Sequence, residues 1–251
     1  MIELWILAAT QGLTEFLPVS SSGHMVLVQQ WFNIQMPGVQ IEIALHLATL
    51  FSICVYFHRD IFNLFKPGSK DKPQVKWLTP IAVSVLITGC IGLLFKDWII
   101  ENFHDIRITS ISLIVAGFVI FATRFTKPGN LRITIWVGVL FGLVQTMALL
   151  PGVSRSGSTI ALLLFLGVNR EEAFKFSFIA VLPLLLAASL LELDQGLFSV
   201  YGAFPTLMAM LIAFVIGLIT LSVLQKMMLK QFFYIFGYYC MAIGVFSLIN
   251  S

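Results

Sequence analysis

The stretch 11-QGLTEFLPVSSSGHM-25 places a carboxylate, three consecutive serines and a histidine between two apolar segments, residues 3–15 and 25–34. Each segment is too short to cross a bilayer, because a spanning helix needs about 20 apolar residues. Irregular backbone at membrane depth is tolerated only where it is buried in protein or lines a wet cavity. The pattern therefore predicts a re-entrant hairpin, two half-length helices that enter and leave on the same side. In the alternative interpretation the hairpin lies at the membrane surface, where its polar residues are merely solvated.

The composition of the whole chain supports a membrane setting. Of its 251 residues, 59% are hydrophobic and only 11% are charged, and the mean hydropathy is +0.96. A soluble domain carries about 25% charged residues, so this chain has too few to cover a surface that faces water. We therefore expect an all-α polytopic membrane protein, with a single membrane domain over residues 1–251. Six stretches are predicted to span the membrane: 41–57, 77–95, 108–123, 172–191, 205–224 and 232–250.

The charges in the connectors indicate which side of the membrane each connector faces. Lys and Arg gather in 58–76, 124–132 and 225–231, whereas 192–204 has two acids and no base, and 96–107 is slightly acidic. Because basic connectors remain in the cytoplasm, the first three are assigned there and the other two to the outside. In this topology the first hairpin enters from the outside.

A second region has the same organisation. Residues 133–149 and 159–168 are apolar, and 150-LPGVSRSGS-158 lies between them, which predicts a second re-entrant hairpin that enters from the cytoplasm. The two regions align without a gap at an offset of 134 residues. Each half contains a hairpin and three spans, so we expect an inverted-topology repeat with halves of about 1–123 and 133–250, a common plan for membrane sites that handle polar cargo. The identical pairs are Gln11–Gln145, Val19–Val153, Ser20–Ser154, Ser22–Ser156 and Gly23–Gly157.

The second motif, 151-PGVSRSGST-159, has the chemistry of an anion site. Its glycines, Gly152 and Gly157, let the backbone approach a ligand closely, and the following helix presents free N–H groups and a positive dipole end. Arg155 adds a planar fork of donors that suits phosphate oxygens. A Ser/Gly-rich turn alone is weak evidence, because such turns also simply cap helices. The arginine strengthens the anion interpretation, since ionisable groups inside a membrane are functional by default.

The first motif supplies groups that would act on such an anion. Glu15 is a candidate base or ligand of a divalent cation, and Gln11, one helical turn earlier, shares its face. One of the serines 20–22 is a candidate nucleophile, and His24 can move a proton near neutral pH. An anion clamp that faces an acid–base group is the arrangement expected for phosphoryl hydrolysis.

The two motifs together resemble those of the undecaprenyl-pyrophosphate phosphatases, also called bacitracin-resistance proteins. The family's E-x-x-x-E segment, running into P-V-S-S-x-G-H, reads Q-G-L-T-E-F-L-P-V-S-S-S-G-H here, and its P-G-x-S-R-S-G-x-T is matched in full. The resemblance extends over nearly the whole chain. It implies an integral phosphatase of the bacterial inner membrane that converts polyprenyl pyrophosphate to the monophosphate for cell-wall synthesis.

The same resemblance makes Glu15, Ser21, His24 and Arg155 the catalytic group, with Glu15 as base or as ligand of Mg²⁺ or Ca²⁺. It leaves open whether Ser21, His24 or a water attacks phosphorus. One position departs from the family: its first glutamate is Gln11 here, which cannot act as a base, so metal affinity or activity would be weaker. The other expected contacts to substrate phosphates come from Gln11, Ser20, Ser22, Ser154, Ser156 and Thr159.

A second function also fits the pattern. A transporter or flippase of polyprenyl phosphate would suit an inverted repeat with opposed hairpins. We expect contacts with membrane lipids, no nucleic-acid partner, and a site that opens to the outer side; a homodimer is compatible with the sequence. His46 lies four residues after Glu42, so the two share a helix face. Either this pair lies beside the site and supports it, or the two residues only bond to each other.

Overall fold

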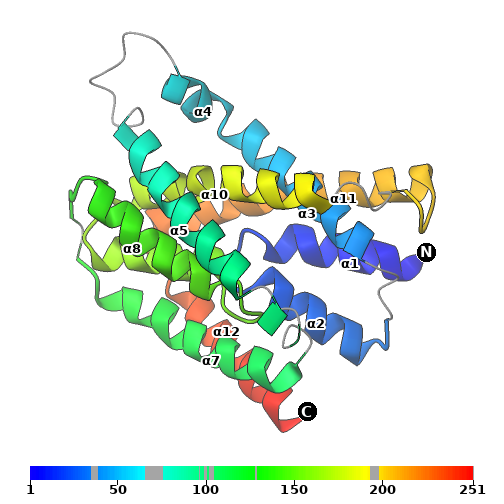
Figure 1. Cartoon of the computed structure of the whole chain (residues 1–251). Coiled ribbons are helices and arrows are strands. Elements are labelled where there is room, and N and C mark those ends of the chain that lie inside the picture. Colours follow the sequence, from blue (N-terminus) through cyan, green and yellow to red (C-terminus); the bar gives the residue numbers. More distant parts are fainter. Residues whose placement is uncertain are drawn as a thin grey trace.

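The computed structural model describes residues 1–34, 39–65, 76–95, 97–98, 101, 105–127, 129–192 and 198–250. Over these residues the chain is helical and contains no strand (Figure 1). The helices are α1 (Ile2–Thr14), α2 (Ser21–Trp31), α3 (Val39–Tyr56), α4 (His58–Phe65), α5 (Leu78–Leu94), α7 (Ile106–Ala122), the 3-10 turn η2 (Thr123–Phe125), α8 (Ile135–Met147), α9 (Arg155–Phe165), α10 (Arg170–Glu192), α11 (Ala203–Leu229) and α12 (Ile235–Ile249).

Each of the six predicted spans coincides with one of these helices: α3, α5, α7, α10, α11 and α12. Within the described residues, three segments are long and apolar enough to cross a membrane: Ile106–Phe125, Arg170–Leu190 and Ala203–Leu229. A fourth results if α3 and α4, bent by 74° to each other, are counted as one span. The helices α5 and α12 are apolar but shorter. These helices and the apolar composition make the chain a multi-pass membrane protein, whereas the arrangement of six spans stays a prediction.

The two hairpin regions each form a pair of short helices, α1 with α2 and α8 with α9. Their second arms begin four residues earlier than predicted, at Ser21 instead of 25 and at Arg155 instead of 159. The reason is capping: Ser20 and Ser154 each accept a hydrogen bond from the backbone three residues on, which starts the helix there. The polar residues that were expected to link the arms therefore lie in the first turns of α2 and α9.

The first helix of each hairpin packs against one of the predicted spans, α1 against α11 and α8 against α5. The helices α7 and α12 form a third pair, which lies side by side at the lower edge of Figure 1. Small residues allow the close approach of α7 and α12: a Cβ added at Gly117 would lie 2.8 Å from the carbonyl oxygen of Gly237. Such small-residue contacts are the usual way in which membrane helices approach.

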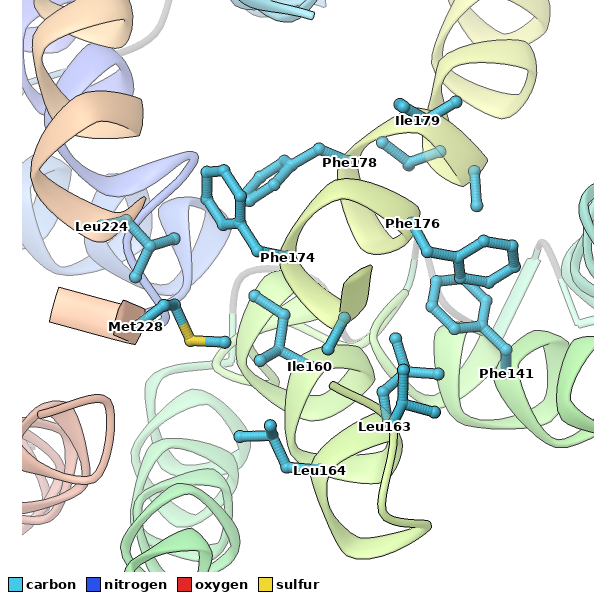
Figure 2. Close-up of a cluster of buried hydrophobic side chains, with 14 of the residues drawn as sticks. Phe141, Ile160, Leu163, Leu164, Phe174, Phe176, Phe178, Ile179, Leu224 and Met228 are labelled. Atoms are coloured by element: carbon cyan, nitrogen blue, oxygen red, sulfur yellow. The ribbon is translucent and has the colours of Figure 1, made fainter. Parts of the chain in front are cut away.

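A buried aromatic cluster surrounds α10 and supports the second hairpin (Figure 2). Phe176 packs edge-on against Phe141 of α8, with ring centroids 5.1 Å apart. Phe174 and Phe178 contact each other at 5.2 Å on another face of α10. Residues of α9 and α11 complete the cluster, which fixes α9 against α10 and holds the ring of Phe178 beneath the site described next. They include Ile160, Leu163, Leu164, Leu224 and Met228.

Candidate active site

The tips of the two hairpins touch each other. Ser156 donates a hydrogen bond to the carbonyl oxygen of Leu17, at 3.3 Å. The backbones of Gly23 and Gly152 approach so closely that a Cβ added at Gly23 would lie 3.0 Å from the Cα of Gly152. Gly152 has a φ of +87°, and a side chain there would collide with a backbone carbonyl of α7, so only glycine fits this turn. The two motifs predicted to form one site therefore do meet.

The carboxylate of Glu15 lies at the centre of this contact. Its Oε2 accepts hydrogen bonds from Ser21 Oγ at 2.6 Å and from Gln11 Nε2 at 3.0 Å. Its Oε1 accepts one from Arg155 Nη2 at 3.2 Å. The Glu15 side chain is only 7% exposed, so these partners replace the water that a carboxylate would otherwise require. The predicted sharing of one helix face by Gln11 and Glu15 is confirmed.

Arg155 is held from two sides and keeps one donor free. Its guanidinium lies over the ring of Phe178, 5.5 Å from the centroid, and its Nη2 is bonded to Glu15. Its Nη1 is buried and has no hydrogen-bond partner. A buried donor without a partner is costly, so an anion that accepts from Nη1 would be bound favourably.

His24 has different partners from the other predicted catalytic residues. Its Nδ1 lies 2.8 Å from the carbonyl oxygen of Ser20, and its Nε2 lies 2.9 Å from the hydroxyl of Tyr239 on α12. A carbonyl can only accept, so Nδ1 carries a proton and a neutral His24 accepts the Tyr239 hydroxyl proton at Nε2. The two rings are nearly parallel. Both nitrogens of His24 are thus engaged, while Ser21 donates directly to Glu15.

The hydroxyls predicted to line a phosphate site have partners within the protein in this structure. Ser20 and Ser154 cap α2 and α9, and each lies near a second serine hydroxyl, Ser22 at 3.3 Å and Ser156 at 3.4 Å. Thr159 donates to the carbonyl oxygen of Arg155 at 2.7 Å and contacts Ser177. Ser20 adopts a φ of 69°, which is rare for a residue with a side chain and is typical of strained functional sites. Their contact with substrate stays a prediction.

The donor set around Glu15 bears on the predicted divalent cation. The described residues contain no group of three or more His, Cys, Asp or Glu side chains that could hold a metal. Mg²⁺, however, is commonly held by one or two carboxylates together with phosphate oxygens of the substrate. Glu15, beside the amide of Gln11, whose Nε2 donates to it, fits this second kind of site, in which phosphate oxygens of the substrate supply the other ligands.

Three residues of the site lie outside the two sequence motifs. Phe178 comes from α10 and Tyr239 from α12, and nothing in the sequence around them distinguishes them from the other aromatic residues. The third is His46, for which the sequence indicates Glu42 as a partner. Its Nδ1 does bond to Glu42, but to the backbone oxygen, and its Nε2 faces Glu15 Oε2 at 3.9 Å.

Comparisons with known proteins show which proteins this chain is similar to. A family model described as bacitracin resistance protein BacA matches residues 4–246. A protein named undecaprenyl-diphosphatase from Desulforapulum autotrophicum is 36% identical over 97% of this chain and 96% of its own. One of the same name from Treponema denticola is 36% identical over 96% of this chain and 93% of its own. A third, from Methanococcus vannielii, is 33% identical over 98% of both.

Proposed function

Because the chain belongs to the bacitracin resistance protein BacA family, we propose that it is an undecaprenyl-diphosphatase. It hydrolyses undecaprenyl diphosphate to the monophosphate and inorganic phosphate, and so recycles the lipid carrier of cell-wall synthesis. One observation supports this function above the others: Glu15 binds the Ser21 hydroxyl on one oxygen and Arg155 on the other. The proposed base, Glu15, thus contacts both the proposed nucleophile and the proposed anion clamp.

Ser21 is the nucleophile in this proposal. Its Oγ–H already donates to Glu15 Oε2 at 2.6 Å, which is the base–nucleophile contact that activates a serine. Glu15 takes the proton while Oγ attacks the terminal phosphorus, and the bond from that phosphorus to the bridging oxygen breaks. The lipid monophosphate leaves, and a water then releases phosphate from Ser21. His24, held by Ser20 and Tyr239 one turn along α2, orients the start of that helix or moves a proton from the attacking water.

Arg155 and the two helix N-termini bind the charged group. The free Nη1 of Arg155 would donate to a phosphate oxygen, and stacking on Phe178 keeps the guanidinium plane in place. The first turns of α2 and α9 contribute backbone N–H groups, because most N–H groups there have no partner within the helix. Ser20, Ser22, Ser154, Ser156 and Thr159 would line the same pocket.

A divalent cation completes the proposal. When bound, Mg²⁺ or Ca²⁺ would neutralise charge on the diphosphate. Glu15 and Gln11 would supply the protein's ligands to it. Since only one of them is a carboxylate, the affinity in the absence of substrate is expected to be low.

We further propose that six spans and two re-entrant hairpins form an inverted repeat in the bacterial inner membrane, with the site open to the outer side. The positions of α2 and α9 support the repeat, because both helices have 11 residues and they begin 134 residues apart. The pairing of α1 with α11 and of α8 with α5 supports it too, since each pair joins a hairpin to a span of the other half. In this proposal the substrate enters the site from the lipid bilayer. A homodimer stays a prediction.

The proposal is tested with the purified protein in detergent, with undecaprenyl diphosphate and Mg²⁺ or Ca²⁺. We expect the wild type to release phosphate at a steady rate. Arg155→Ala should abolish this release, and the surface variant Arg124→Ala should retain it. If the wild type releases none, while vesicles that contain it move polyprenyl phosphate between leaflets in an Arg155-dependent manner, the protein is a lipid transporter instead.

A further inference from the structure

The last helix of the chain, α12, reaches the site through one hydroxyl group. The phenol of Tyr239 donates a hydrogen bond to Nε2 of His24 at 2.9 Å, although 215 residues separate the two in the chain. Their rings are stacked, with centroids 5.6 Å apart and planes inclined by only 9°. Because His24 is buried, its Nε2 would be costly to leave without this donor.

Two further contacts hold α12 against the first hairpin. Cys240, the next residue, donates from Sγ to the carbonyl oxygen of Pro18 at the hairpin tip, at 3.4 Å. Further along α12, the ring of Phe246 packs edge-on against Trp31 at the end of α2, with centroids 5.6 Å apart. The hydroxyl of Tyr239 therefore comes from a helix that is attached to the hairpin on both sides of it along the chain, and its position is fixed.

His24 transmits this constraint to the backbone next to the proposed nucleophile. Its Nδ1 and its backbone N–H both donate to the carbonyl oxygen of Ser20, at 2.8 and 3.1 Å. That carbonyl belongs to the peptide unit that joins Ser20 to Ser21, and a peptide unit is planar. Holding its oxygen therefore fixes the direction of the Ser21 N–H and the position of the Ser21 Cα. The strained φ of 69° at Ser20 persists only because such contacts hold it.

The bond from Tyr239 also decides which nitrogen of His24 carries the proton. His24 can donate to the Ser20 carbonyl from its side chain only while that proton is on Nδ1. In a neutral imidazole the position of the proton is set by the bond that the other nitrogen makes. The Tyr239 hydroxyl donates to Nε2, so it keeps a lone pair there and the proton on Nδ1. Without the hydroxyl, the proton can move to Nε2, and Nδ1 would then present a lone pair to the carbonyl oxygen.

We propose that Tyr239 is a positioning residue for the nucleophile and acts through His24, an inference that rests on the function proposed above. The phenol holds the imidazole, the imidazole holds the Ser20–Ser21 peptide unit, and this unit holds Ser21 Oγ at its 2.6 Å hydrogen bond to Glu15. Tyr239 itself touches neither the substrate nor the reacting atoms. The start of α2 thus depends on a hydroxyl from the far end of the chain.

The substitution Tyr239→Phe removes the hydroxyl and keeps the ring that stacks on His24. We expect kcat for phosphate release to fall about 10-fold, because a small displacement of a nucleophile is enough for such a loss, while KM changes by less than about twofold. The matched control is Tyr238→Phe, which removes the same group one residue earlier. Tyr238 packs against Phe121 of α7, with ring centroids 5.0 Å apart, and its substitution should leave kcat unchanged.

Two further measurements show whether Tyr239 acts through His24. In the first, Tyr239→Phe is combined with His24→Gln, and the double variant should be no slower than His24→Gln alone, because the two residues act as one unit. The second is a ¹H–¹⁵N correlation spectrum of protein with ¹⁵N-labelled histidine, in alkaline buffer in which histidine is neutral. The chain has four histidines, and His24→Gln identifies the signals of His24. They should place the proton on Nδ1 in the wild type and on both nitrogens, in exchange, in Tyr239→Phe.

The outcomes distinguish the positioning role from the enzyme. A Tyr239→Phe protein with the kcat of the wild type, or with unchanged His24 signals, overturns the positioning role and leaves the phosphatase function intact. A raised KM at an unchanged kcat overturns it too, as does a double variant slower than His24→Gln by the full factor of Tyr239→Phe, because Tyr239 would then act without His24. A wild type that releases no phosphate overturns the proposed function, and the positioning role with it.

Discussion

The first hairpin, α1–α2, and the second, α8–α9, have the same framework and different chemistry. In both, a serine caps an 11-residue helix through the N–H of a glycine three residues on. The residues that differ include those proposed to be catalytic: Glu15, Ser21 and His24 in the first hairpin stand where the second has Leu149, Arg155 and Ser158. The same capped helix start is thus present twice, while the proposed base and nucleophile lie on the first copy and the arginine on the second.

The largest effect is expected from removing the group that only the first hairpin has. Glu15→Gln should lower phosphate release about 10²- to 10⁴-fold, because the amide keeps the size of the side chain but cannot take the Ser21 proton. The control is Glu3→Gln, an exposed acid on the same helix. Thermal unfolding of both variants should be followed, since Arg155 loses its charged partner. A folded Glu15→Gln protein with more than about a tenth of the wild-type rate would contradict the assignment of Glu15 as base.

The next largest effect concerns the group that only the second hairpin has. Arg155→Lys should reduce kcat about 100-fold, because a lysine keeps the charge but not the fork that reaches Glu15 and a phosphate oxygen together. Arg124→Lys is the control, since Arg124 is exposed and lies over the ring of Tyr234, away from the site. Equal rates for Arg155→Lys and the wild type would mean that charge alone suffices and that the free Nη1 has no role.

A smaller effect is expected at Gln11, which matches Gln145 of the second hairpin but replaces a glutamate of the family motif. Gln11→Glu should raise the rate a few-fold, or lower the Mg²⁺ or Ca²⁺ concentration that gives half the maximal rate, because two carboxylates hold a divalent cation better than one. Phosphate release measured across a cation titration checks both. Gln30→Glu, an exposed position near the end of α2, serves as the control. An unchanged rate together with an unchanged cation dependence would contradict the proposed role of position 11 in cation binding.

The smallest effect compares the two caps. Ser20 has a φ of 69° and Ser154 a φ of −67°. Glycine at Ser20 removes about 1 kcal/mol of backbone strain and loses only a few tenths as a cap, so Ser20→Gly should be neutral or stabilising. Ser154→Gly has no strain to relieve and should destabilise by about 0.5 kcal/mol. Thermal unfolding in detergent gives the two signs; the same sign for both would show that the strain at Ser20 is unimportant.

Sequence patterns predicted the parts of the site that depend on local spacing. The four-residue spacing of Gln11 and Glu15 predicts that they share a helix face. The compact motif around Arg155 indicates that this arginine is a partner of the site. The pattern predicts the starts of α2 and α9 four residues late, because it does not distinguish serines that cap a helix from serines that link two helices. Tyr239, Phe178 and the orientation of His46 depend on how distant helices pack, and no local pattern encodes that packing.

The spacing of the groups around Glu15 also matters while the chain is being made. Gln11 and Ser21 lie four and six residues from Glu15, whereas Arg155 follows it by 140. At a synthesis rate of about 5–20 residues per second, the arginine leaves the ribosome on the order of ten seconds after the carboxylate. During that interval Glu15 has two neutral neighbours, and the nascent chain carries the proposed base and nucleophile without the proposed anion clamp. We therefore expect no phosphate release from the chain before its second half has been made.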